Sequence, residues 1–162
     1  MNAAYGSLEV ALPLFIHRQL HASAELMGLT WMIYAIGTLA GASLNVFFGK
    51  RPMDRRIPMV MICLWAGAIM SAGLAADSWI LLISFAIAGI SFKAYPPFAR
   101  TIVQSIVPTA IRGRVFSFRS AVTVAGSPIG GGLAGMVIAS HAPSFMIFLV
   151  GISVLVFGIN SC

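Results

Sequence analysis

The sequence predicts an all-α, polytopic membrane protein in which residues 1–162 form a single bundle of six transmembrane helices. Three observations support this prediction: 59% of the 162 residues are hydrophobic, only 9% are charged, and long apolar runs follow one another along the chain. A soluble domain carries roughly 25% charged residues, because its surface faces water. Helices are the expected conformation in lipid, because each backbone N–H and C=O must find its partner within the protein.

Six apolar runs define the expected transmembrane helices. A span needs roughly 20 residues to cross ~30 Å of hydrocarbon. The runs cover residues 2–16, 26–48, 57–76, 79–107, 115–140 and 144–159. The residues that close or separate them are charged or polar, and in chain order they include Arg18, Lys50, Asp77, Arg112, His141 and Asn160. The first run is short and begins beside Met1, so we expect the chain to be a piece of a longer protein.

Lysine and arginine indicate how these helices are oriented in the membrane. They are concentrated around the second and fourth connections, as Lys50, Arg51, Arg55 and Arg56, and as Arg100, Arg112, Arg114 and Arg119. Cytoplasmic loops of membrane proteins carry this excess of positive charge. We therefore expect both basic connections and both chain termini on the cytoplasmic side. The net charge of +6 does not indicate nucleic-acid binding, because the sequence has no basic helix and no basic patch interleaved with aromatic residues.

Catalysis, metal binding and cofactor binding find no support in the sequence. Cys63 and Cys162 form no CxxC motif, and the three histidines fall in connections without metal-ligand spacing. The sequence contains no GxxxxGK[ST] phosphate-binding loop and no Ser/His/Asp arrangement. We therefore expect neither an enzyme nor a cofactor, and we expect no metal site.

Glycine spacing suggests an internal repeat of three plus three helices. Glycines four residues apart let helix backbones approach closely. They recur in the second and fifth spans, at Gly37, Gly41, Gly126, Gly130, Gly131 and Gly135. Each of these spans is the middle one of three, and a basic connection follows one and precedes the other, as in an inverted-topology repeat. The alternative is that glycine is simply common in membrane helices.

Glu9 and Lys93 are the two ionisable residues well inside the spans. A charge in the bilayer core costs roughly 2.5–3.5 kcal/mol on insertion scales, so it usually faces a cavity or a partner. We expect Glu9 to carry a proton and Lys93 to hold an anion or a counter-charge, with Tyr95 beside it in a substrate cavity. The alternative for Lys93 is that its ammonium extends to the inner interface near Arg100.

Prolines inside the spans mark candidate kinks or hinges. Pro13, Pro96, Pro97 and Pro128 each remove a backbone donor, which bends a helix. The pair Pro96-Pro97 directly follows Tyr95 and lies near Lys93, and a broken helix beside a charged residue is a common place for a binding site or hinge. A purely structural kink is the alternative.

The connection between the fourth and fifth spans resembles a segment of a known family. Gln104, Val107-Pro108 and Arg112-Gly113-Arg114-Val115 match the pattern Q-x-x-V-P-x-x-x-R-G-R-V, which joins the tenth and eleventh helices in part of the major facilitator superfamily. Residues 6–14 look like the seventh helix of the same branch, the macrolide- and enterobactin-exporter-like proteins. Asp54-Arg55-Arg56 is similar to the basic loop after the eighth helix, although its spacing from Gly49 is one residue longer than the superfamily pattern.

The resemblance implies that the chain is the C-terminal six-helix half of a twelve-helix secondary transporter. It further implies proton-coupled efflux of small amphipathic molecules across the bacterial plasma membrane (the inner membrane), with Glu9 and Lys93 in the central cavity. The partners would then be the lipid bilayer, a small-molecule substrate, and either an N-terminal transporter half or a second copy of the chain. Two alternatives stay open: a non-transporting six-helix assembly or regulatory subunit, and a channel.

Overall fold

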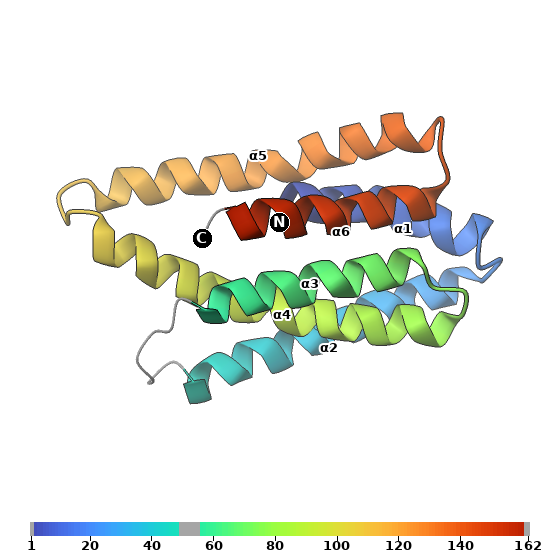
Figure 1. The fold of residues 1–162 in the computed structure, drawn as a ribbon, viewed down its shortest axis with the longest axis horizontal. Coiled ribbons are helices and arrows are strands. Elements are labelled where there is room, and N and C mark those ends of the chain that lie inside the picture. Colours follow the sequence, from blue (N-terminus) through green and yellow to red (C-terminus); the bar gives the residue numbers. More distant parts are fainter. Residues whose placement is uncertain (1, 49–55, 161–162) are drawn as a thin grey trace.

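The computed structural model describes residues 2–48 and 56–160, which form six α-helices joined by short connections (Figure 1). The helices are α1 (Asn2–Arg18), α2 (Ala24–Phe48), α3 (Arg56–Gly73), α4 (Ser78–Ile106), α5 (Arg112–Ile138) and α6 (Pro143–Asn160). Each helix covers one expected span, and its ends lie within three residues of the expected ends. The described residues contain no strand.

Helix length limits how many of these helices can cross a membrane. Among the described residues, three segments are both long and apolar enough: Ala24–Asn45, Ser78–Pro97 and Arg112–Ile138. Ile57–Gly73 and Pro143–Val156 are apolar but shorter. By length and composition three of the six expected spans are therefore supported, and the spans expected over α1, α3 and α6 stay a prediction. The physical reason is helix length: α1, with 17 residues, covers only ~26 Å of the ~30 Å hydrocarbon core.

Three helix pairs build the bundle: α1 packs on α5, α2 on α4, and α3 on α6. Consecutive helices alternate in direction, so α1 runs parallel to α5 and α2 runs parallel to α4 (Figure 1). In addition α3 packs on α4, and α6 packs on α1. The largest buried side chains of the core include Trp65, Phe15 and Phe85. This set of contacts maps onto itself when α1, α2 and α3 are exchanged with α4, α5 and α6 in that order.

Glycines bring the backbones of α2 and α4 together. A Cβ added to Gly37 would collide with the carbonyl oxygen of Ala86, and one added to Gly89 would collide with the carbonyl oxygen of Tyr34. Further along α2, a Cβ on Gly41 would collide with the backbone of Ile90. Only glycine tolerates such close approach of two helix backbones.

The α1–α5 pair uses the same arrangement. A Cβ on Gly130 would collide with the carbonyl oxygen of Ala3, and one on Gly6 would collide with the carbonyl oxygen of Ser127. The Ser7 hydroxyl adds a hydrogen bond across the pair, donated to the carbonyl oxygen of Gly130 at 2.9 Å. Backbone contact and a buried hydrogen bond therefore both fix α1 against α5.

The two crossings have the same register. Gly37 follows Tyr34 by one helical turn just as Gly130 follows Ser127, and Gly89 follows Ala86 just as Gly6 follows Ala3. The sequence carries the same correspondence along α1 and α4. Identical residues recur there at Ala3, Gly6, Ala11, Pro13 and Phe15, and at Ala86, Gly89, Ala94, Pro96 and Phe98.

The other predicted packing glycines differ in their surroundings. A Cβ on Gly126 would approach the Ala3 nitrogen at 3.3 Å, and one on Gly131 would meet the Gly6 oxygen at 3.4 Å. A Cβ on Gly135 would meet nothing within 4 Å in this chain, so a packing role for Gly135 stays a prediction. Gly131 and Gly135 lie four residues apart and share a face of α5, but only Gly131 reaches α1.

Candidate functional site

Two cavities lie in the seam, which we define as the space between the α1–α5 pair and the α2–α4 pair. The first, the Arg119 cavity, has a volume of about 460 Å³ and is lined by α1, α4 and α5. The second, the aromatic cavity, has a volume of about 420 Å³ and is lined mainly by α1, α2 and α4. Asn2 and Phe92 line both cavities. Both volumes fall within the range of small-molecule sites, roughly 300–1,000 Å³.

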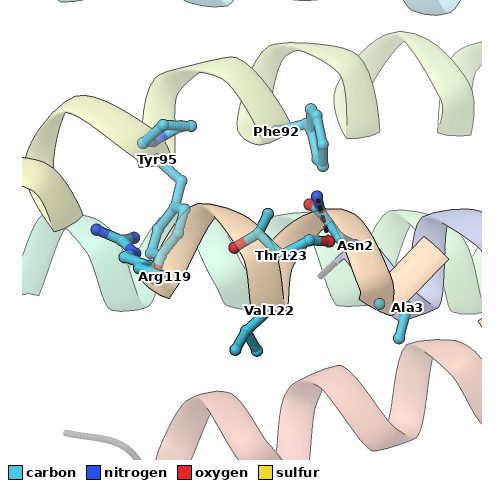
Figure 2. Close-up of a pocket in the computed structure, with 9 residues that line it drawn as sticks. Asn2, Ala3, Phe92, Tyr95, Arg119, Val122 and Thr123 are labelled. Carbon is cyan, nitrogen blue, oxygen red and sulfur yellow. Dashed lines mark hydrogen bonds between the residues drawn. The ribbon is translucent and has the colours of Figure 1, made fainter. Parts of the chain in front are cut away.

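The Arg119 cavity combines aromatic, polar and cationic side chains. Phe92 and Tyr95 extend from α4 toward α5, where Arg119 and Thr123 lie (Figure 2). The Asn2 amide closes one end by donating a hydrogen bond to the carbonyl oxygen of Thr123 at 3.2 Å. A smaller cavity of about 210 Å³ shares Arg119 and continues toward the α4–α5 connection, where Arg100 also lines it.

A cluster of aromatic rings forms the wall of the aromatic cavity. Tyr5 stacks on Phe92 with ring centroids 5.8 Å apart, and it meets Trp31 edge-on at 5.7 Å. Trp31 in turn meets Tyr34 edge-on at 5.7 Å. These separations are those of favourable aromatic pairs. The cluster joins α1, α2 and α4, so it connects the two helix pairs across the seam.

Two of the three predicted cavity residues line the seam cavities. Lys93 lines the aromatic cavity, with its Nζ 5.9 Å from the ring centroid of Phe92, and Tyr95 lines the Arg119 cavity. Glu9 is exposed and is not among the residues that line the three cavities described above. It lies one helical turn after Tyr5, on the same side of α1. No ion pair joins Glu9 to Lys93 or to any other described residue.

The four prolines predicted as kinks or hinges all lie inside helices. Helix α1 continues through Pro13, α4 through Pro96 and Pro97, and α5 through Pro128. Pro96 lines the Arg119 cavity. A hinge role for these prolines stays a prediction.

Asn45 ties α2 to α4 directly beside the aromatic cavity, because its amide donates a 3.0 Å hydrogen bond to the carbonyl oxygen of Lys93. Replacing Asn45 with leucine is expected to lower the free energy of unfolding by about 1 kcal/mol, the usual size of such interhelical bonds. Thermal unfolding in detergent measures the effect. Ser43→Ala is the control, because the exposed Ser43 hydroxyl bonds only within its own helix. Equal shifts for both variants would refute a packing role for Asn45.

The α4–α5 connection is held by Arg112. Its guanidinium donates to the carbonyl oxygen of Gln104 at 2.9 Å and to that of Val107 at 3.1 and 3.3 Å. These carbonyls belong to the C-terminal turn of α4, which lacks helical partners. Val107 is extended, as expected of a residue before proline, and Pro108 then starts the turn. The arginine of the sequence motif therefore caps one helix from the start of the next.

The structure assigns no comparable contact to the remaining motif residues that it describes. Gly113 and Arg114 are exposed, and a Cβ on Gly113 would meet nothing within 4 Å. Asp54 and Arg55 lie outside the described residues. Arg56 begins α3, but its side chain is outside the described part of the chain.

Sequence reasoning missed most of the residues that line the seam: Asn2, Tyr5, Trp31, Tyr34, Phe92, Arg119 and Thr123. One signal was available on α1, where Asn2, Tyr5 and Glu9 recur at helical spacing on one face. A second signal was Arg119, which follows Arg112 by about two helical turns and so lies well inside α5 rather than in the basic connection.

The surface and the seam together define the class of protein. Large apolar side chains are exposed around the bundle, among them Trp79, Phe118 and Met136, each about three-quarters exposed. A soluble protein rarely exposes such surface without a partner. Within the described residues, no group of three His, Cys, Asp or Glu side chains could hold a metal ion. The fold and seam are those of an α-helical membrane protein with room for a small organic molecule.

The family follows from comparison with known proteins. The sequence matches the Major Facilitator Superfamily over residues 1–161. The chain therefore belongs to this superfamily, which is a family of membrane transporters. A search of curated proteins returned no match. Membership in a transporter family also fits a protein that is not an enzyme.

Proposed function

We propose that the chain is the C-terminal six-helix half of a major facilitator exporter, which moves small amphipathic molecules out of a bacterial cell in exchange for protons. The observation that carries this proposal is the shared glycine register of the α1–α5 and α2–α4 crossings. Two sets of three helices that pack alike but run in opposite directions are the building plan of one transporter half. In such a half the substrate site lies where the repeats meet, as the seam cavities do.

Charge supports the orientation. The start of α5 lies at the same end of the bundle as the ends of α2 and α4 (Figure 1). Arg100, Arg112 and Arg114 lie at or near that end, and positively charged connections face the cytoplasm. We therefore propose that this end, with both chain termini, is cytoplasmic, in the bacterial inner membrane. The Q-x-x-V-P-x-x-x-R-G-R-V segment supports placement in the macrolide- and enterobactin-exporter-like branch.

A partner bundle belongs to the proposal. Alternating access rocks one bundle against another around a site between them. The seam cavities are only partly enclosed, and a second six-helix bundle would complete their walls. The partner is an N-terminal transporter half or a second copy of this chain. A purified monomer that exported substrate from liposomes would refute this requirement.

Export is tested by dye accumulation in bacteria that lack their major efflux pumps. Expression of the protein is expected to lower accumulation of an amphipathic fluorescent dye, and a protonophore is expected to restore it. Glu9→Gln is expected to reduce the protonophore-sensitive export about tenfold or more, the range over which a positioned proton carrier contributes.

The matched control is Glu25→Gln, because Glu25 is exposed in the first turn of α2. Export that survives both the protonophore and Glu9→Gln would contradict proton coupling. A protein that reaches the membrane and forms a dimer there in all variants, yet gives no export, would instead favour the non-transporting subunit.

A further inference from the structure

Arg119 is a charged side chain without a partner in an apolar helix. It lies inside Arg112–Ile138, one of the segments long and apolar enough to cross a membrane. No hydrogen bond, ion pair or ring contact links its guanidinium to another described residue. A cation in such a segment is costly unless it faces water or an opposite charge. A ligand bound in the Arg119 cavity could supply that opposite charge.

The charges around the seam have one sign. Lys93, Arg100 and Arg119 line the three cavities, whereas none of the described residues that line them is an aspartate or glutamate. Glu9 is not among the lining residues. A cationic ligand would therefore meet like charges without a carboxylate to offset them. An anionic ligand would meet a guanidinium whose planar fork matches a carboxylate with two parallel hydrogen bonds.

Aromatic side chains add a second requirement. Phe92 and Tyr95 extend over the same cavity from α4, opposite Arg119 on α5 (Figure 2). A flat ring packed between them gains the attraction of offset or edge-on aromatic pairs. The cavity volume of about 460 Å³ is large enough for a ring system with one acidic group.

We propose that the Arg119 cavity binds an aromatic organic anion, with Arg119 pairing with the acidic group and Phe92 and Tyr95 packing on the ring. This inference deepens the proposed transport function and rests on it for its role in the cell. It narrows the substrate from amphipathic molecules in general to those that carry a negative charge next to an aromatic system.

Binding is tested with three probes that separate charge from ring: 2-naphthoate, 2-naphthylmethylammonium and octanoate. The full chain is purified in maltoside micelles, which carry no phosphate, and titrated calorimetrically against empty micelles. Naphthoate is expected to bind about tenfold or more tightly than the ammonium probe, because a hydrogen-bonded charge pair is worth about one decade of affinity or more. Octanoate is expected to bind several-fold more weakly than naphthoate, because it lacks the ring.

Variants identify the residue. Arg119→Gln is expected to remove the preference for naphthoate, and Arg119→Lys is expected to keep part of it, because lysine retains the charge without the fork. Arg18→Gln, at the exposed end of α1, lowers the net charge equally and is expected to leave the preference unchanged. Gel filtration checks that each variant remains folded.

Several results would overturn the inference. These are equal or tighter binding of the ammonium probe, an equal loss for Arg18→Gln and Arg119→Gln, and displacement of naphthoate by short-chain phosphatidylglycerol alone. The last result would assign Arg119 to a lipid headgroup. If dye export is present while probe charge makes no difference, only the substrate class fails. If no probe binds and no export occurs, the proposed function fails with it.

Discussion

Replacing Gly130 with alanine is expected to lower the free energy of unfolding by about 3 kcal/mol, the upper range for overpacked sites. The added Cβ would collide with the carbonyl oxygen of Ala3, and both groups belong to helix backbones that cannot turn aside. The α1–α5 pair would have to separate, which also strains the hydrogen bond from Ser7 to Gly130. Thermal unfolding in detergent measures the loss.

The matched control is Gly132→Ala, on the same helix and two positions away. A Cβ on Gly132 would meet nothing within 4 Å, so this substitution is expected to leave stability unchanged or to raise it by up to about 1 kcal/mol. Both substitutions raise helix propensity equally. Equal unfolding temperatures for the two variants would show that the crossing does not depend on backbone contact.

Replacing Arg112 with methionine is expected to cost about 2 kcal/mol, because the guanidinium donates charge-assisted hydrogen bonds to the end of α4. Methionine keeps much of the side chain's length but has no donor. The carbonyl oxygens of Gln104 and Val107 would lose these donors. The expected results are a lower unfolding temperature and faster proteolysis within the α4–α5 connection.

Arg114→Met serves as the control for charge, because Arg114 is exposed and makes no hydrogen bond among the described residues. Arg112→Lys is expected to fall between the two, since lysine keeps the charge but lacks the planar fork that donates from two nitrogens. If Arg112→Met and Arg114→Met behave alike, the motif arginine acts outside this connection.

The six helices could be predicted closely from the sequence, because long apolar runs have few alternatives to helix in lipid. The number of helices long and apolar enough to cross a membrane could not be predicted in the same way. Charged and polar residues limit the apolar length of the helices, and the 17 residues of α1 include Glu9 near their middle. The structure therefore supports the predicted helix ends more closely than it supports the predicted number of membrane spans.

The packing glycines illustrate what spacing alone leaves open. The pairs Gly126–Gly130 and Gly131–Gly135 have the same spacing, yet Gly130 presses on α1 and Gly135 faces open space. Spacing fixes which residues share a face, and the position of the neighbouring helix decides which of those residues it covers. The recurrence of Ala3, Gly6 and Pro13 as Ala86, Gly89 and Pro96 is the stronger signal, because it aligns α1 with α4 residue by residue.

The seam residues were hard to predict for a related reason. Aromatic side chains in a membrane protein can face either lipid or a cavity. Here Trp79 and Phe118 are largely exposed, while Tyr5 and Trp31 line the seam. Their roles depend on contacts between α1, α2 and α4, which are distant in the sequence. Charge within a span was a partial guide, because Lys93 lines a cavity whereas Glu9 does not line the cavities described above.

The unequal packing of the helices determines where this protein can deform. Within α1–α5 and within α2–α4, backbone touches backbone, so neither pair can slide without a collision. Between the pairs, the direct contacts are mainly aromatic rings around the cavities, while α3 and α6 join the pairs indirectly, because α3 packs on α4 and α6 packs on α1. We therefore expect each of these two helix pairs to move as a rigid unit, and the bundle to flex at the seam between them. Since the cavities lie in the seam, a change of a few degrees in the angle between the pairs would change the width of the cavities while leaving both glycine crossings intact.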